Sequence, residues 1–293
     1  MRSARTPPMR RERWELEDGD FLDLDVLPSP PTAPCVVILH GLEGSSRAGY
    51  VAAIVRGAER ECWGAVALNF RSCSGEPNRL PRMYHSGDIG DARLVLERLR
   101  AEGRRTIFGV GFSLGGNVML RLLAELGDSA PLKAAAAVSV PFDLAGCAQA
   151  IDRASGLASL YRWIFLRSLR EKALEKARCF PGSLDPDAVR AAHGIVAFDD
   201  AATAPLHGFA SAGAYYDACS SGPALDRIRR PTLCVSSEDD PMVPARYLPE
   251  PRNPLVELLV TRAGGHVGFV SGSLLRPKFW AEEQVLAFFR RTV

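Results

Sequence analysis

The chain has 293 residues, of which 47% are hydrophobic, and this is enough to bury one large core or two modest ones. Its formal net charge of +2 gives no strong electrostatic attraction to nucleic acid, so we expect no nucleic-acid partner. No apolar run reaches the roughly 18 residues of a membrane-spanning helix, so we expect no transmembrane segment.

Residues 1–11 are basic and contain prolines, but they lack the apolar stretch of a signal peptide. The seven cysteines form no C-x-x-C pair and show no zinc-ligand spacing, and Cys35 and Cys234 fall in expected core strands. We therefore expect free thiols and a cytoplasmic protein. The sequence contains no metal-ligand cluster, phosphate loop or dinucleotide fingerprint, and so it predicts neither a metal nor a cofactor.

Strand and helix patterns alternate through the first half of the chain. Apolar and polar residues alternate at 12–27 around a turn at 18–20, which predicts an antiparallel hairpin at the edge of a sheet. The remaining expected elements are strands at 35–39, 64–69, 106–110 and 133–140, and helices at 50–60, 88–102 and after residue 113. This alternation favours one mostly parallel sheet with helices on both faces.

Strand patterns disappear between about residues 142 and 216, where helical stretches such as 157–178 take over. That stretch places Tyr161, Trp163, Ile164, Phe165 and Leu166 beside many arginines and lysines. One interpretation is a basic amphipathic surface with weak contact to lipid. We favour the other, in which the aromatic side chains pack on the core and the basic face is solvated. Strands at 231–235 and 255–260 and an amphipathic helix at 277–291 complete the chain.

The segment Gly111-Phe112-Ser113-Leu114-Gly115 lies between an expected strand and an expected helix. A strand that turns sharply into a helix at G-x-S-x-G is typical of the nucleophile elbow of serine hydrolases. The tight turn pushes the serine side chain out of the sheet, and the glycines avoid clashes with neighbouring backbone. Ser113 is therefore the candidate nucleophile.

In hydrolases of this kind the acid and then the histidine follow the nucleophile along the chain. Of the five histidines, only His266 follows the late acidic cluster Glu238-Asp239-Asp240. Each of these two segments comes after an expected strand, where open parallel sheets place their sites. Asp240 is the preferred triad acid because an Asp-Pro-x-x-Pro pattern begins there, with Asp239 and then Asp143 as alternatives.

The strand expected at 35–39 ends in His40-Gly41-Leu42. An oxyanion hole of this type uses the backbone N–H that follows the nucleophile and another from the loop after an early strand. We therefore expect Leu114 and Leu42 to donate these two bonds. His40 itself is expected to support the loop by hydrogen bonding.

Several segments resemble the YheT-like family of the α/β-hydrolase superfamily. They are His40-Gly41-Leu42-Glu43-Gly44-Ser45-Ser46, the stretches 69–78 and 84–88, Gly111 to Asn117, Asp239-Asp240-Pro241 and Gly264 to Phe269. Ser72 departs from the family pattern, which usually has glycine there. The Tyr84-His85-Ser86 block matches the family, but it suggests no chemical role for His85 or Ser86. One interpretation is that these two residues extend the site, and we favour the other, a structural role in their loop.

The resemblance implies an α/β-hydrolase fold, with one domain over 1–293 and a helical cap inserted at approximately 143–215. It also implies a serine carboxylester hydrolase that forms an acyl-enzyme through Ser113, Asp240 and His266. The expected partner is a small acyl ester, either a short-chain ester or a monoacylglycerol. A thioesterase or amidase with the same triad, and a non-catalytic binding protein on this scaffold, are the alternatives. The sequence does not predict the natural substrate or the oligomeric state.

Overall fold

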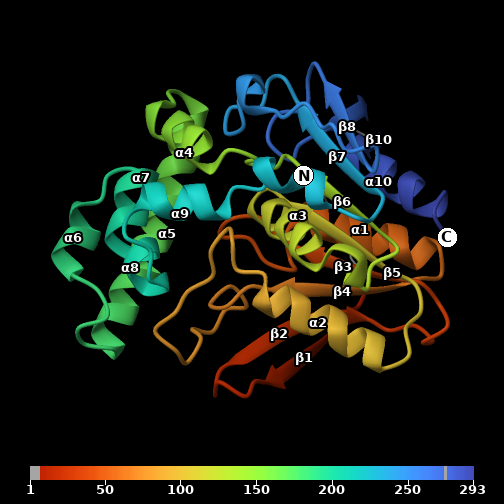
Figure 1. The fold of residues 1–293 in the computed structure, drawn as a ribbon, viewed down its shortest axis with the longest axis horizontal. Coiled ribbons are helices and arrows are strands. Elements are labelled where there is room, and N and C mark those ends of the chain that lie inside the picture. Colours follow the sequence, from red (N-terminus) through yellow and green to blue (C-terminus); the bar gives the residue numbers. More distant parts are fainter. Residues whose placement is uncertain (1–6, 274–275) are drawn as a thin grey trace.

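The computed structural model describes residues 7–273 and 276–293. An eight-stranded sheet in the order β1-β2-β4-β3-β5-β6-β7-β8 runs through the molecule (Figure 1). Its strands are β1 (Arg10–Glu15), β2 (Phe21–Leu27), β3 (Cys35–Leu39), β4 (Gly64–Asn69), β5 (Ile107–Phe112), β6 (Ala134–Val138), β7 (Thr232–Ser237) and β8 (Val256–Thr261). β2 pairs antiparallel with both β1 and β4, and the other pairs are parallel. The predicted edge hairpin and mostly parallel sheet are confirmed.

Helices cover both faces of this sheet, as the sequence predicted. Those that pack on the sheet are α1 (Gly49–Arg60), α2 (Gly90–Ala101), α3 (Leu114–Leu126) and α10 (Trp280–Arg290). The others are α4 (Leu144–Arg153), α5 (Leu157–Cys179), α6 (Pro186–Ala191), α7 (Ile195–Phe198), α8 (Ala204–His207) and α9 (Ala212–Cys219). Helices α2 and α3 share one buried cluster with the sheet, while α1 and α10 share the opposite one. Among the described helices, none is both long and apolar enough to cross a lipid bilayer.

The central strands are short and apolar because both of their faces are covered. Every residue of β3, β4, β5, β6 and β7 is buried. Strands in this position lack the alternation of a half-exposed sheet and appear in the sequence as continuous apolar runs. Their carboxyl ends lie along one edge of the sheet, and the polar residues that follow them therefore gather there.

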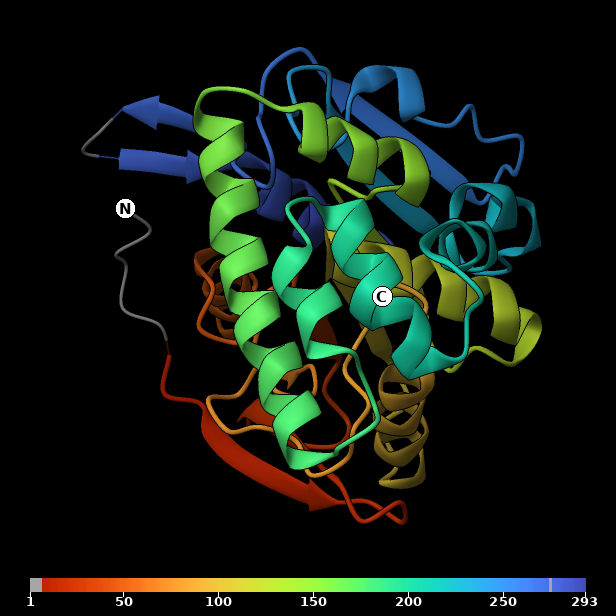
Figure 2. The same ribbon diagram turned by 90° about the vertical axis from the view of Figure 1, so that its left-hand side faces the viewer.

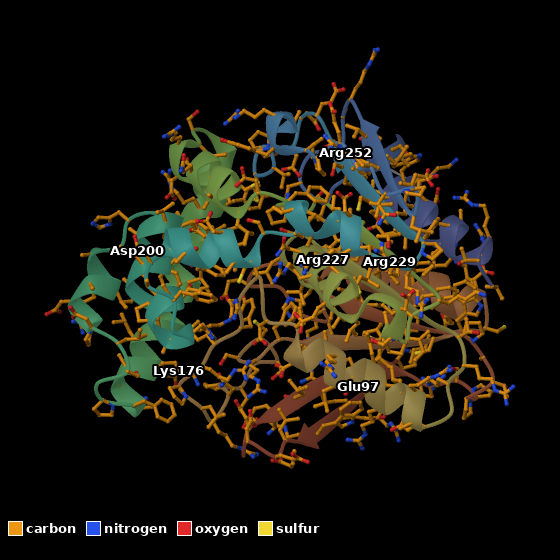
Figure 3. The ribbon with its side chains drawn as sticks, in the orientation of Figure 1. Glu97, Lys176, Asp200, Arg227, Arg229 and Arg252 are labelled. Carbon is orange, nitrogen blue, oxygen red and sulfur yellow. The ribbon has the colours of Figure 1, made fainter. Side chains whose placement is uncertain are left out.

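Helices α4 to α9 are inserted between β6 and β7 and form a separate layer beside that edge (Figures 1 and 2). The long helix α5 packs inward through Leu166, Leu169 and Ala173. Near its other end lies Lys176 (labelled in Figure 3), whose Nζ donates to the backbone carbonyl of Leu80 at 2.7 Å. The inserted layer is thus fixed to the loop that precedes α2.

The first turns of α5 do not follow the interpretation we favoured. Trp163 is 54% exposed, Tyr161 is 50% exposed and Ile164 is 45% exposed. Only Leu166 of the apolar residues named there is fully buried, and Phe165 is half-buried. The expected packing is wrong because apolar side chains occur on both sides of this segment, and one side already covers the core.

The helix predicted at 277–291 begins later, at Trp280. Before it, β9 (Val270–Ser273) and β10 (Arg276–Phe279) form a separate antiparallel pair. The prediction began this helix at Pro277, and proline is common at the first position of a helix. Residues 274–275, between the two strands, lie outside the described residues, as do residues 1–6 of the basic start.

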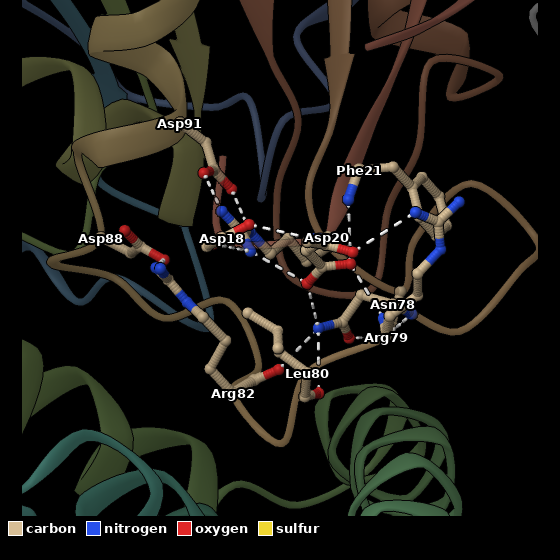
Figure 4. A network of polar contacts seen from close by, with 12 residues as sticks. Asp18, Asp20, Phe21, Asn78, Arg79, Leu80, Arg82, Asp88 and Asp91 are labelled. Carbon is tan, nitrogen blue, oxygen red and sulfur yellow. Dashed lines mark hydrogen bonds and ion pairs between the residues drawn. The ribbon is translucent and has the colours of Figure 1, made fainter. Parts of the chain in front are cut away.

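A buried ionic network holds the loop after β4 against the β1–β2 turn (Figure 4). The Arg71 side chain is 3% exposed and binds both carboxylate oxygens of Asp91, at 2.9 and 2.8 Å. It also contacts Asp18 and Asp20 at 2.9 Å each. Asn78 donates to Asp20 at 2.8 Å. Since every carboxylate here faces a donor, the network can keep a charged cluster buried and fix the course of this loop.

Candidate active site

Three polar side chains meet at the carboxyl edge of the sheet. Ser113 directly follows β5, Asp240 follows β7 and His266 follows β8. These strands belong to the parallel part of the sheet, so their carboxyl ends point the same way. The sheet topology therefore brings Ser113 together with two residues that lie more than a hundred positions further along the chain.

The turn at Ser113 is strained and depends on glycine neighbours. Ser113 has φ 52° and ψ −119°, a conformation that side-chain-bearing residues rarely adopt. A Cβ atom on Gly111 would lie 2.2 Å from the backbone oxygen of Gly115. One on Gly115 would lie 2.4 Å from the backbone oxygen of His40. Neither glycine can gain a side chain without moving backbone, and the turn presents Ser113 to the cavity.

A continuous hydrogen-bond chain links the three side chains. Ser113 Oγ lies 2.9 Å from His266 Nε2, and His266 Nδ1 lies 2.9 Å from Asp240 Oδ2. A carboxylate beside Nδ1 favours the tautomer with its proton on that nitrogen. Nε2 is then free to accept the Ser113 proton, as a general base must.

Asp240 is the carboxylate that the structure places on His266. It is 4% exposed, and its Oδ1 also accepts hydrogen bonds from the backbone amides of Met242 and Val243 at 2.9 and 3.0 Å. These amides hold the carboxylate beside His266. The Pro241 turn after Asp240 supplies them, which is consistent with the sequence pattern that led us to prefer this residue.

The two alternative carboxylates accept hydrogen bonds from backbone amides instead. Asp239 accepts hydrogen bonds from the amides of Gly264 and Gly265, both at 2.8 Å, and so holds the loop that carries His266. Asp143 accepts from the amide of Gly146 at 2.9 Å and caps the start of α4. Neither carboxylate contacts the imidazole in the described structure.

Two backbone amides beside Ser113 are free to bind a ligand. Among the described residues, no hydrogen bond occupies the amide of Leu42 or that of Leu114. Leu114 is the first residue of α3, where amide groups and the helix dipole favour negative charge. Leu42 lines the same cavity as Leu114 and Ser113. The sequence had selected these two residues as oxyanion donors.

Glu43 anchors the loop that presents Leu42, and sequence reasoning missed this role. Its backbone has φ 53°, and its amide donates to Tyr84 Oη at 2.8 Å. The Glu43 carboxylate accepts from Tyr84 Oη at 2.7 Å, from Lys172 Nζ at 2.9 Å and from the Ser168 hydroxyl. Helix α5 is therefore tied directly to this loop. The partners are distant in sequence, so no local pattern could reveal them.

His40 supports the neighbouring turn, as expected. It is fully buried, its Nδ1 donates to the backbone oxygen of Gly41 at 2.7 Å, and its Nε2 accepts from the amide of Phe70 at 3.1 Å. Burial lowers the pKa of His40 from 6.5 to about 4. The ring is thus neutral at pH 7, which matches one donating and one accepting nitrogen.

A cavity of about 720 Å³ opens beside Ser113 and His266. Its wall is mostly apolar and aromatic and comes from the sheet edge and from the inserted helices. His85 and Ser86, for which we favoured a structural role in their loop, line it, and the Ser86 amide donates to Tyr215 Oη at 3.0 Å. His207 also lines the cavity, whereas His193 is exposed. Among the described residues, no group of three histidine, cysteine or acidic side chains is arranged to hold a metal ion.

Comparisons with known proteins agree with this architecture. Residues 36–283 match the model of a family described as "Alpha/beta hydrolase family". YheT, a proposed esterase of Escherichia coli, is 41% identical over 282 residues, which cover 94% of this chain and 82% of that protein. A monoacylglycerol lipase of Saccharomyces cerevisiae is 32% identical, over 83% of this chain and 56% of the yeast protein.

The solved structure of a Pyrococcus furiosus esterase, Pf2001, superposes with a TM-score of 0.62. The alignment covers 97% of this chain and 92% of the esterase chain, at 17% sequence identity. At this level of identity the likeness concerns the fold alone.

Proposed function

This chain belongs to the alpha/beta hydrolase family, in the group of YheT, and on that premise we propose that it is a serine carboxylester hydrolase. The observation that carries the proposal is the unbroken chain from Ser113 through His266 to Asp240 beside an apolar cavity. These groups in this order allow a serine to become a nucleophile at neutral pH.

In the proposed reaction, His266 Nε2 takes the Ser113 proton while Oγ attacks the ester carbonyl carbon. The carbonyl oxygen becomes negatively charged and accepts hydrogen bonds from the amides of Leu42 and Leu114. The imidazolium then gives its proton to the departing alcohol, which leaves an acyl-enzyme. Asp240 stabilises the charged imidazole and holds its orientation.

Water completes the cycle by the same route. His266 removes a proton from the water, the resulting hydroxyl attacks the acyl carbon, and the proton returns to Ser113 as the acid departs. The fixed amide dipoles stabilise both tetrahedral intermediates without reorganising.

The wall of the cavity supports an acyl ester as the substrate. Apolar and aromatic side chains such as Leu144, Ile151 and Phe198 can bury a hydrocarbon chain. A relative is named as a monoacylglycerol lipase, which is consistent with our expectation of short-chain esters or monoacylglycerols. A panel of nitrophenyl esters of increasing acyl length will define the preferred acyl chain. Thioester and amide analogues will define the preferred leaving group.

The test is hydrolysis of 4-nitrophenyl butyrate by the wild type and by Ser113→Ala. We expect the variant to lose essentially all turnover while remaining folded, since its side chain differs by one oxygen atom. Ser129→Ala is the matched control, because Ser129 is exposed and its hydroxyl donates to the Leu126 carbonyl of its own turn. Activity near the wild-type level in Ser113→Ala would refute the nucleophile.

A further inference from the structure

The charge of the cavity wall is asymmetric. Among the described residues that line the cavity, Asp199 is the one carboxylate, and no lysine or arginine accompanies it. Burial lowers the pKa of His85, and it lowers that of His207 to about 4. Both imidazoles are thus neutral at pH 7. The wall therefore offers one negative group and no positive group to whatever enters.

In the described part of the chain, Asp199 accepts hydrogen bonds from two neutral side chains. It begins a short π-helical turn (Asp199–Thr203), which joins α7 to α8. Thr203 Oγ1 and Tyr216 Oη each donate to one of its oxygens, both at 2.6 Å. Among the described residues, none forms an ion pair with it. Burial raises the pKa of Asp199 to about 6, so the carboxyl group is mainly ionised at pH 7.

An ionised carboxylate can accept about four hydrogen bonds, and two of these positions are in use. Removing such a charge from bulk water is costly unless a counter-charge or further donors offset it. The described protein supplies no counter-charge. Since Asp199 lines the cavity, a ligand can supply one.

Aromatic rings occur in the same wall. Phe198 directly precedes Asp199 in the chain, and Tyr215 and Tyr216 lie with ring centroids 5.2 Å apart. Tyr161 and Phe165 of α5 also line the cavity. Aromatic faces attract organic cations, most strongly where water is excluded.

We propose that Asp199 and these aromatic side chains form a subsite for an organic ammonium group carried by the ester substrate. The inference rests on the proposed esterase activity and specifies its substrate: a neutral ester bond near Ser113, with a cationic group toward Asp199. The same wall disfavours esters or thioesters that bring a phosphate group or a carboxylate into the cavity, because no described cation lines it.

The test compares esters that differ only in that charge. Butyrylcholine is paired with 3,3-dimethylbutyl butyrate, in which a carbon replaces the charged nitrogen. 4-Nitrophenyl 4-(trimethylammonio)butyrate is paired with 4-nitrophenyl 5,5-dimethylhexanoate, so that the cation lies on the acyl side instead. In at least one pair we expect the wild type to prefer the cationic ester in kcat/KM by about tenfold or more.

The charge is then removed with Asp199→Asn. The ratio of kcat/KM for the cationic ester to kcat/KM for the neutral ester should then fall to about onefold. The ratio within a pair is the readout, because asparagine also loses one of the two donor contacts and can lower both rates. Asp200→Asn is the matched control. Asp200 (labelled in Figure 3) is the next residue, is exposed and is absent from the cavity lining, so its variant should keep the wild-type ratio.

The outcomes separate the two proposals. Equal rates for both members of both pairs in the wild type would overturn the subsite and leave the esterase proposal standing. A preference that survives Asp199→Asn would also overturn it, because the charge would then act elsewhere. Failure of every ester, 4-nitrophenyl butyrate included, would overturn the esterase activity and the subsite with it.

Discussion

Glu43 joins the loop of the proposed oxyanion hole to helix α5, and Glu43→Gln tests what that junction does. The Glu43 side chain is 6% exposed, so glutamine must take its place among three donors without the charge. Losing one partner of a buried ion pair costs about 3–5 kcal/mol, but Lys172 is 22% exposed and can partly hydrate. We therefore expect the free energy of unfolding to fall by about 2 kcal/mol.

The effect on catalysis follows from the position of Leu42 beside Glu43. Loss of one oxyanion donor typically lowers kcat by about 10²- to 10³-fold. Because Tyr84 still contacts the loop, we expect a smaller fall in kcat of about 10- to 100-fold, with KM changed less than about threefold. Steady-state hydrolysis of 4-nitrophenyl butyrate measures both constants, and urea denaturation measures stability.

Two further variants separate catalysis from stability. Adding Lys172→Met to Glu43→Gln removes the unpaired cation, which should restore stability but leave kcat low. Glu171→Gln is the control, because Glu171 lies on the same helix but is exposed and pairs with Arg167. If Glu43→Gln loses stability yet keeps kcat within about twofold of the wild type, Glu43 does not position the oxyanion hole.

Three other predictions concern the triad acid, the buried neutral histidine and the buried ionic network. If Asp240 is the triad acid, Asp240→Asn should lower kcat by about 10⁴-fold, by analogy with the same change in a Ser-His-Asp enzyme, and Asp239→Asn by about tenfold or less. Equal small losses in the two variants would show that Asp240 is not the triad acid. The unfolded state binds more protons than the folded state between the two pKa values of His40, 6.5 and about 4, so stability falls as the pH drops through this window. Replacing His40 with glutamine should make this fall in unfolding free energy smaller by about 3 kcal/mol, as measured by urea denaturation at a series of pH values. An unchanged dependence of the unfolding free energy on pH would contradict a neutral buried His40 ring. Arg71→Met leaves three carboxylates without their cation and should cost about 3–5 kcal/mol in unfolding free energy, whereas a loss below about 1 kcal/mol would show that the network adds little.

The sequence predicted features whose causes are local. The short apolar strands, the edge hairpin and the glycines around Ser113 each reflect a steric or burial requirement of neighbouring residues, and the structure contains all of them. The chain order of Ser113, Asp240 and His266 also guided the search, since the parallel sheet brings successive strand ends together.

Features that depend on tertiary contacts were missed. The role of Glu43 requires Ser168 and Lys172, which approach it only after the inserted helices fold against the sheet. The sequence could not predict which side chains at the start of α5 are exposed, because this part of the helix carries apolar side chains on both its inner and its outer side. Asp199 lay in a segment whose helices are too short for periodicity to identify.

The most direct test of the central claim is covalent labelling with a fluorophosphonate, followed by intact mass and peptide mapping. The proposal predicts one adduct per chain, on Ser113, and much slower labelling of His266→Ala, because Ser113 Oγ would then lack its base. No adduct on the folded wild type, or an adduct on another serine while Ser113 stays unmodified, would contradict it.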